Sequence, residues 1–195
     1  MRAASLAGVR AALGAALLAG LSACGSGSEE TTAASAAKSA DGTLATALSD
    51  APGMTTVSTA LKSTGLSNVF DGGAAYTILA PDDDAFGALG AAGTGLQQPV
   101  NSAAMAAILR DHILPGYLTV ADIDAALKAS GGKPVKMKTM GDTEVSFIRE
   151  GDALVVSMPD GARAKVDGAG LVASNGVVIP LDAVLHKLPA GDGAG

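Results

Sequence analysis

Residues 76–89, YTILAPDDDAFGAL, contain a strand signal, a stop and the start of a helix. The first five residues favour an extended strand, and Pro81 ends it because proline has no N–H to donate to a neighbouring strand. A carboxylate just before a helix accepts hydrogen bonds from the first helical amides, so we expect Asp82 or Asp83 to cap the helix that follows. That helix is expected to have an apolar stripe made by Ala85, Phe86 and Leu89. The stretch therefore predicts a buried strand that turns directly into a core helix.

A second motif near the end of the chain, NGVVIPLDAVL at 175–185, combines a turn signal with a strand. Together with TILAPDDDAF at 77–86, it resembles the two signature motifs of the fasciclin domain family. The segments at 44–66 and at 112–123, the latter HILPGYLTVADI, look like the opening helices and a central segment of the same family. The resemblance covers about residues 41–190. It implies an α+β fold, a fasciclin-like wedge built on a β-sandwich with helices packed at one side.

The hydrophobic pattern along the chain predicts the same fold class. Residues 43–70 repeat apolar positions at helical spacing, and a second amphipathic helix is expected at about 101–112, after a glycine-rich loop at 90–95. From residue 133 onward the period becomes two, in short runs separated by glycine-containing turns, which indicates an antiparallel meander. Helices that precede strands along the chain favour an α+β fold.

Asn175 and Gly176 form a strong hairpin-turn signal before the last strand. We expect the turn to require positive φ, which only glycine adopts without steric cost. For Asp182, in the same motif, the family resemblance implies a structural hydrogen-bonding role, with a surface contact as the alternative.

The first residues of the chain have the features of a bacterial lipoprotein signal peptide. Arg2 and Arg10 flank a short apolar run that is too short to span a membrane, and the string Leu-Ser-Ala-Cys that follows looks like a lipobox. We expect Cys24 to be acylated, for example with palmitate, and the alternative is a lone buried cysteine. The predicted organisation is a signal peptide at 1–23, an acylated cysteine and disordered tether at 24–42, a fasciclin-like domain at 43–190 and a flexible tail at 191–195.

The charge of the chain argues against nucleic acid as a partner. It has 13 basic and 19 acidic side chains, with a formal net charge of −6. An acidic protein binds polyanions poorly unless its basic residues cluster. Such a cluster is conceivable on two predicted strands, where Lys136 alternates with Lys138 and Arg163 with Lys165. The preferred interpretation is a solvated outer face whose charges discourage edge pairing.

Residue patterns for catalysis are absent from the sequence. No G-x-S-x-G elbow is present, the single cysteine is assigned to the anchor, and His112 and His186 lie in different elements. His112 falls on an apolar helical stripe, which favours a core histidine with hydrogen-bonded nitrogens over a ligand or base. The aspartates at 82–84 lack the later ligands of an EF-hand loop, so helix capping is preferred over calcium binding. We expect no enzymatic activity, no metal and no cofactor.

The family resemblance implies an extracytoplasmic adhesion or binding module that attaches the cell or its envelope to a protein or glycan. The membrane is a second expected partner, through the lipid on Cys24. The alternatives are a carrier or scavenger of a small hydrophobic ligand and an envelope scaffold without a specific partner. We expect the adhesion surface at the corner where the 101–112 helix gives way to an extended stretch. The candidate residues are His112, Ile113, Leu114 and Tyr117.

Overall fold

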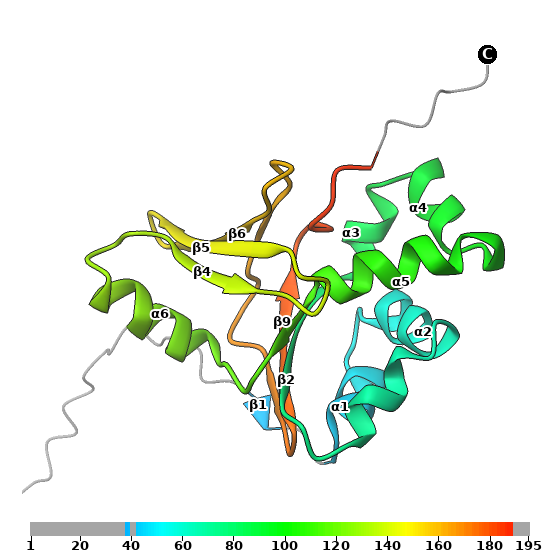
Figure 1. Ribbon diagram of the computed structural model, residues 1–195, viewed down its shortest axis with the longest axis horizontal. Helices are drawn as coiled ribbons and strands as arrows, with labels where there is room; N and C mark the ends of the chain where they lie inside the picture. The colour runs from blue at the N-terminus through cyan, green and yellow to red at the C-terminus, as the bar shows by residue number, and fades with distance from the viewer. Residues whose placement is uncertain (1–37, 40–41, 189–195) are drawn as a thin grey trace, which may run out of the picture. The chain divides into compact units, whose positions relative to one another are not determined.

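The computed structural model describes residues 38–39 and 42–188 (Figure 1). The expected signal peptide at 1–23, Cys24, most of the expected tether and the tail at 191–195 lie outside the described residues. Its strands are β1 (Lys38–Ser39), β2 (Tyr76–Pro81), β3 (Ile113–Pro115), β4 (Val135–Lys138), β5 (Glu144–Glu150), β6 (Ala153–Ser157), β7 (Arg163–Lys165), β8 (Leu171–Ala173) and β9 (Gly176–Leu181). Its helices are α1 (Leu44–Asp50), α2 (Thr55–Ser63), α3 (Asp83–Gly87), α4 (Ala91–Leu96), α5 (Ser102–Asp111) and α6 (Val120–Ala129), with short 3-10 helices η1 (Leu66–Asp71) and η2 (Pro99–Asn101).

The central sheet has five strands in the order β1-β8-β9-β2-β3. Residues 76–81 of β2 pair in parallel with residues 176–181 of β9, so the two sequence motifs lie side by side. Neighbouring side chains of β2 enter different cores, because Ile78 faces helices α1 to α5 whereas Leu79 faces the second sheet. The sheet is therefore buried on both faces, which explains why β2 is apolar without interruption.

The second sheet is an antiparallel meander of β4, β5, β6 and β7, as the sequence predicts. It is joined to the central sheet where Val166 bridges to Leu181 at the end of β9. Beside this bridge, the Asp182 carboxylate accepts a hydrogen bond from the backbone N–H of Lys165 at 2.6 Å. Asp182 thus has the structural hydrogen bond that the sequence analysis expected.

Helices cover the central sheet on one side, and the second sheet with α6 covers it on the other (Figure 1). The first core contains apolar residues of α1, α2, α3, α4 and α5, including Phe86, and the second core contains Ile123 and Leu127 of α6. Two sheets with packed helices confirm the predicted α+β fold, and α6 adds a helix opposite the other five. Among the described residues, no helix has both the length and the apolar character needed to cross a membrane.

The three-aspartate segment caps two helices. Asp82 caps α3, where its carboxylate accepts from Ala85 N at 2.6 Å. Asp83 turns to α2, where it accepts from Thr56 N at 2.7 Å and Thr55 N at 3.3 Å. Slight burial raises the pKa of Asp83, but the Thr56 and Thr55 donors lower it further, below its ordinary value. The capping prediction is confirmed, and Asp83 joins helices that are distant in sequence.

The expected turn geometry at residues 175–176 is wrong. Gly176 does not have positive φ, since it begins β9 opposite Ala173 of β8. Glycine is required there for space, because a Cβ at this position would lie 2.2 Å from the carbonyl oxygen of Tyr76. Asn175 has a different task from turn formation: its Oδ1 accepts from Leu44 N at 2.7 Å, and its Nδ2 donates to the carbonyl of Phe70. The asparagine therefore fastens the start of α1 and the end of η1 to the hairpin.

Two further expectations change in the structure. The glycine-rich stretch at 90–95 is mostly the helix α4 instead of a loop. Gly93 permits that helix to pack closely, since a Cβ would lie 2.6 Å from the carbonyl oxygen of Phe86. Within the expected tether, residues 38–39 form β1, where Lys38 N donates to Gly170 O at 3.0 Å. Backbone pairing at a sheet edge needs no apolar side chain, so composition did not indicate this strand.

Candidate functional site

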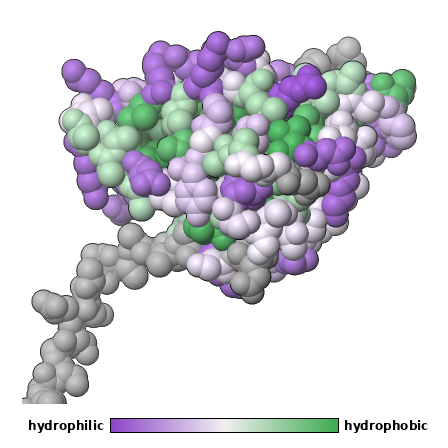
Figure 2. All heavy atoms as spheres, turned by 60° about the horizontal axis from the view of Figure 1, so that its bottom comes forward, coloured by the Kyte–Doolittle hydropathy of each residue, from purple (hydrophilic) through white to green (hydrophobic). Residues whose placement is uncertain are grey.

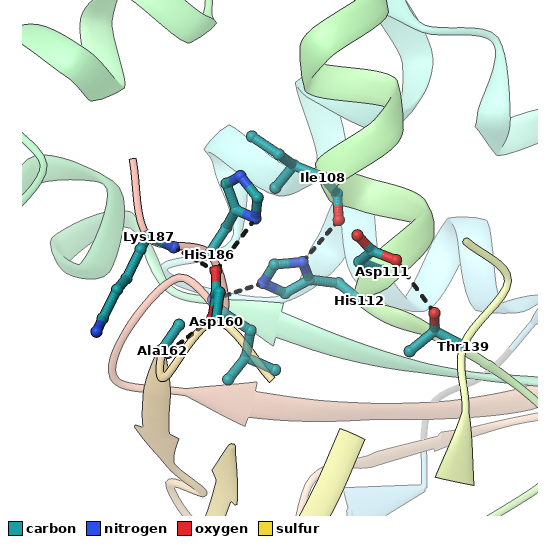
Figure 3. A network of polar contacts seen from close by, with 9 residues as sticks. Ile108, Asp111, His112, Thr139, Asp160, Ala162, His186 and Lys187 are labelled. Carbon is teal, nitrogen blue, oxygen red and sulfur yellow. Dashed lines mark hydrogen bonds and ion pairs between the residues drawn. The ribbon is translucent and has the colours of Figure 1, made fainter. Parts of the chain in front are cut away.

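His112 lies at the centre of a buried polar network (Figure 3). One ring nitrogen, Nδ1, lies 2.8 Å from the carbonyl oxygen of Ile108, and Nε2 accepts from Leu185 N at 2.9 Å. The ring is thus a neutral tautomer that donates to α5 and accepts from the C-terminal segment. Burial lowers the pKa of His112 to about 4, against the smaller opposing effect of the Ile108 carbonyl. The interpretation of His112 as a core histidine with both nitrogens bonded is confirmed.

The predicted contact surface is wrong for three of its four residues. His112 is 2% exposed, and Ile113 and Leu114 are fully buried. The physical reason is that β3 pairs with β2 at the centre of the fold, so Ile113 enters the helical core and Leu114 the core under the second sheet. A side chain without accessible surface cannot contact a partner. Tyr117, which is 43% exposed, is the only one of the four that remains available.

The loop that carries Tyr117 is fastened on both sides. Thr77, a fully buried residue of β2, donates its hydroxyl to Gly116 O at 2.9 Å and accepts from Leu118 N at 2.9 Å. Gly116 N in turn donates to Ala75 O at 2.9 Å. Because the residues before and after Tyr117 are held by the central sheet, the aromatic ring is presented from a fixed backbone. A rigid exposed aromatic side chain loses little entropy on binding, which suits an anchor for a partner.

Large exposed hydrophobic side chains are few in the described part of the chain. They are Tyr117 and Val100, and Val100 on η2 is 87% exposed. On the face shown in Figure 2, hydrophobic residues occur in several places with hydrophilic residues around them. Isolated apolar side chains are normal on protein surfaces, so exposure alone does not identify a site. Tyr117 differs from Val100 in having an amphipathic ring.

A groove of about 500 Å³ runs along the outer side of α5. One face of this helix packs into the core through Met105, Ile108 and Leu109, whereas Ala104 and Ala107 are exposed and form the floor of the groove. The walls come from α4 and from the segment after β9. The full lining is Ala92, Gly95, Leu96, Asn101, Ala104, Ala107, Ile108, Asp111, His186 and Leu188. Small side chains on the helix therefore leave an open, mostly apolar channel.

Comparison with known proteins agrees with this architecture. The family model described as "Fasciclin domain" matches residues 52–187. The chain belongs to the fasciclin domain family. Fasciclin domains are associated with adhesion and binding and are generally non-catalytic.

This fasciclin domain is 31% identical over 136 residues to Protein sll1483 from Synechocystis sp. (strain ATCC 27184 / PCC 6803 / Kazusa). The alignment covers 67% of this chain and 65% of that protein. The fold is also similar to a FAS1 domain pair from the insect cell adhesion molecule Fasciclin I, with a TM-score of 0.65 and 18% identity. That match covers 75% of this chain and 51% of the other chain, so it establishes the fold alone.

The basic residues of this fasciclin domain are paired with acids. Lys136 lies 2.8 Å from Glu144, Lys138 lies 2.8 Å from Asp142, and Arg163 pairs with Glu150. These pairs are exposed and contribute little stability, but they cancel positive charge on the outer sheet. A polyanion site would need that charge to be free. The pairing favours the solvated-face interpretation.

Asp160 is a structural residue that the sequence analysis missed. Its carboxylate accepts from Ala162 N at 2.8 Å and Lys187 N at 2.9 Å, and His186 Nδ1 lies 3.6 Å away (Figure 3). Partial burial raises the pKa of Asp160, but the two backbone donors and the nearby cations lower it further, below its ordinary value. The turn Pro-Asp-Gly was visible in the sequence, but the segment that it binds was not.

Proposed function

We propose that this protein is a lipid-anchored, extracytoplasmic adhesion module that binds a protein or glycan partner. Support comes first from the fasciclin domain, whose family is associated with adhesion and binding. The insect protein with a similar fold is named a cell adhesion molecule, although that name describes the insect protein only. The chain spans 65% of the relative in Synechocystis sp., so the activity of the whole protein is part of the proposal.

The observation that carries the contact site is the Tyr117 loop. Its ring is 43% exposed, while Thr77 holds the backbone on both sides of it through bonds to Gly116 and Leu118. Tyrosine combines a large apolar area with a hydroxyl, and it can stack on a sugar or pack against a protein surface. The buried residues His112, Ile113 and Leu114 support this loop from within and do not touch the partner.

The membrane attachment rests on the sequence around Cys24. The polar residues that follow it give the domain a tether from the bilayer surface, with a typical reach of about 20–25 Å for 18 flexible residues. Many copies on one membrane raise the effective concentration of a weak contact, so dense display strengthens adhesion without new contacts. Adhesion by this protein is therefore multivalent in our proposal.

The test is adhesion of beads coated with the full chain, at several surface densities, to cells or isolated envelope. The variants are Tyr117→Ala and the matched control Val100→Ala, which shortens the other large exposed hydrophobic residue. We expect Tyr117→Ala to weaken adhesion by tenfold or more and Val100→Ala to leave it unchanged, after circular dichroism has shown both to be folded. Equal adhesion by wild type and folded Tyr117→Ala would place the contact elsewhere. If single molecules bound as well as dense coats, the multivalent mechanism would be wrong.

A further inference from the structure

The groove along α5 has a fixed carboxylate at one end. Asp111 is the last residue of α5, and its Oδ1 accepts the hydroxyl of Thr139 at 3.2 Å (Figure 3). Gly141 closes the same side, since a Cβ there would lie 2.2 Å from that oxygen. Within residues 42–188, Oδ2 of Asp111 has no hydrogen-bond donor assigned to it. The carboxylate is therefore oriented by the protein and has one oxygen available for a ligand.

The charge at this end of the groove is negative. His186 also lines the groove, but its Nδ1 faces the Asp160 carboxylate at 3.6 Å. Any positive charge on that imidazole is thus balanced by Asp160, whereas the carboxylate of Asp111 meets only the neutral hydroxyl of Thr139. A cationic group at this end would gain a charge-assisted hydrogen bond.

The opposite end and the middle of the groove are suited to an apolar body. Asn101 lies at the start of α5, ten residues before Asp111, which places the two ends about 15 Å apart along the helix. Asn101 is fixed by donation from Nδ2 to Gly95 O at 2.8 Å. Between these residues the lining is alanine, glycine, leucine and isoleucine. A volume of about 500 Å³ with a few placed polar groups is typical of small-molecule sites.

We propose that this groove binds an elongated amphiphile, with its apolar body on Ala104 and Ala107 and a protonated amine on Asp111. This site is separate from the Tyr117 loop, because α5 and the loop after β3 contribute different residues. The binding of a small molecule therefore stands or falls independently of adhesion. It gives the domain a second, ligand-dependent property.

The test is an NMR titration of the ¹⁵N-labelled full chain carrying Cys24→Ser, which removes the acylation site. The probes are octylamine, 1-octanol and octanoate, which share one alkyl chain and differ in the head group, each below its micelle concentration. We expect shifts confined to α4, α5 and residues 186–188, with the amine binding about tenfold tighter than the alcohol and octanoate weakest.

Two variants separate the head-group contact from the apolar contact. Asp111→Asn keeps an oxygen for Thr139, and we expect it to remove the preference for the amine while the alcohol binds as before. Ala107→Phe fills the groove and should abolish binding of all three probes. Ala103→Phe is the matched control, since Ala103 is exposed on α5 but does not line the groove, and it should bind all three probes as wild type does.

Several results would overturn the proposal. These are equal affinity for the amine and the carboxylate, shifts outside the groove, or unchanged binding by Ala107→Phe. If the amides of the groove shifted with protein concentration in the absence of probe, the occupant would be a second copy of the chain and not an amphiphile. Bead adhesion that depends on Tyr117 is unaffected by any of these outcomes.

Discussion

Protonation of His112 is expected to destabilise the fold at mildly acidic pH. Burial lowers the pKa of this histidine from 6.5 to about 4. Because the folded pKa lies below the unfolded pKa, the unfolded chain takes up the proton first as the pH falls. The stability that neutral His112 contributes is therefore complete above pH 6.5 and is lost as the pH falls toward 4. A difference of about 2.5 pH units corresponds to about 3 kcal/mol of the free energy of unfolding.

The structure gives the reason for this loss. Nε2 of His112 accepts the N–H of Leu185, so a proton on Nε2 would place two donors against each other. The aspartates Asp83, Asp122 and Asp160 act in a different range, because their pKa values are lowered below 3.8. Their stabilising effect is present above pH 3.8 and is lost below it. The two effects are therefore separated on the pH axis.

Urea unfolding followed by circular dichroism, at intervals from pH 7.5 to 4.5, measures the effect. We expect the free energy of unfolding of the wild type to fall by up to about 1.4 kcal/mol per pH unit from His112 alone. His112→Gln offers a neutral acceptor to Leu185 N, and it should be less stable at pH 7 but have a slope smaller by one proton. Equal slopes for wild type and His112→Gln would refute the reasoning.

Three further changes test other parts of the structure. Gly176→Ala should lower the free energy of unfolding by about 1–3 kcal/mol, because the new Cβ meets a backbone oxygen at 2.2 Å. The control Gly87→Ala has no atom within 4 Å and should be neutral in the same urea experiment. Asn175→Ala leaves Leu44 N without its acceptor and should cost about 1–3 kcal/mol, measured as a lower urea midpoint with unchanged slope. Cys24→Ser should release the protein from the membrane fraction, and intact mass of the wild type should show an acylated Cys24 as the first residue; an unmodified thiol would contradict the anchor.

Local features of the fold were predictable from the sequence because neighbouring residues determine them. The strand that ends at Pro81, the cap formed by Asp82 and the meander after residue 133 all follow from short-range chemistry. The parallel pairing of β2 with β9 did not follow from the apolar pattern, because a pattern shows that a strand is buried but not which strand lies beside it. The family resemblance supplied that part of the prediction.

The candidate sites were harder to predict for the same reason. Ile113 and Leu114 follow a helix and looked exposed, but tertiary packing places them on opposite faces of the central sheet. The groove along α5 depends on which elements stand beside Ala104 and Ala107, and alanine carries no local signal for a binding site. Tyr117 was found because an amphipathic aromatic residue beside Gly116 at the end of a short strand has a local explanation.

The parallel pair at the centre of the fold also determines when the domain can form. Residues 76–81 pair with residues 176–181, about one hundred positions later in the chain. During synthesis, β2 has no partner on the β9 side until nearly all of the domain has left the ribosome. Contacts between such distant residues slow folding, since a long loop must close before they form. A chain that completes its central sheet last remains extended for longest, and extended polypeptide is the form that a secretion channel can carry.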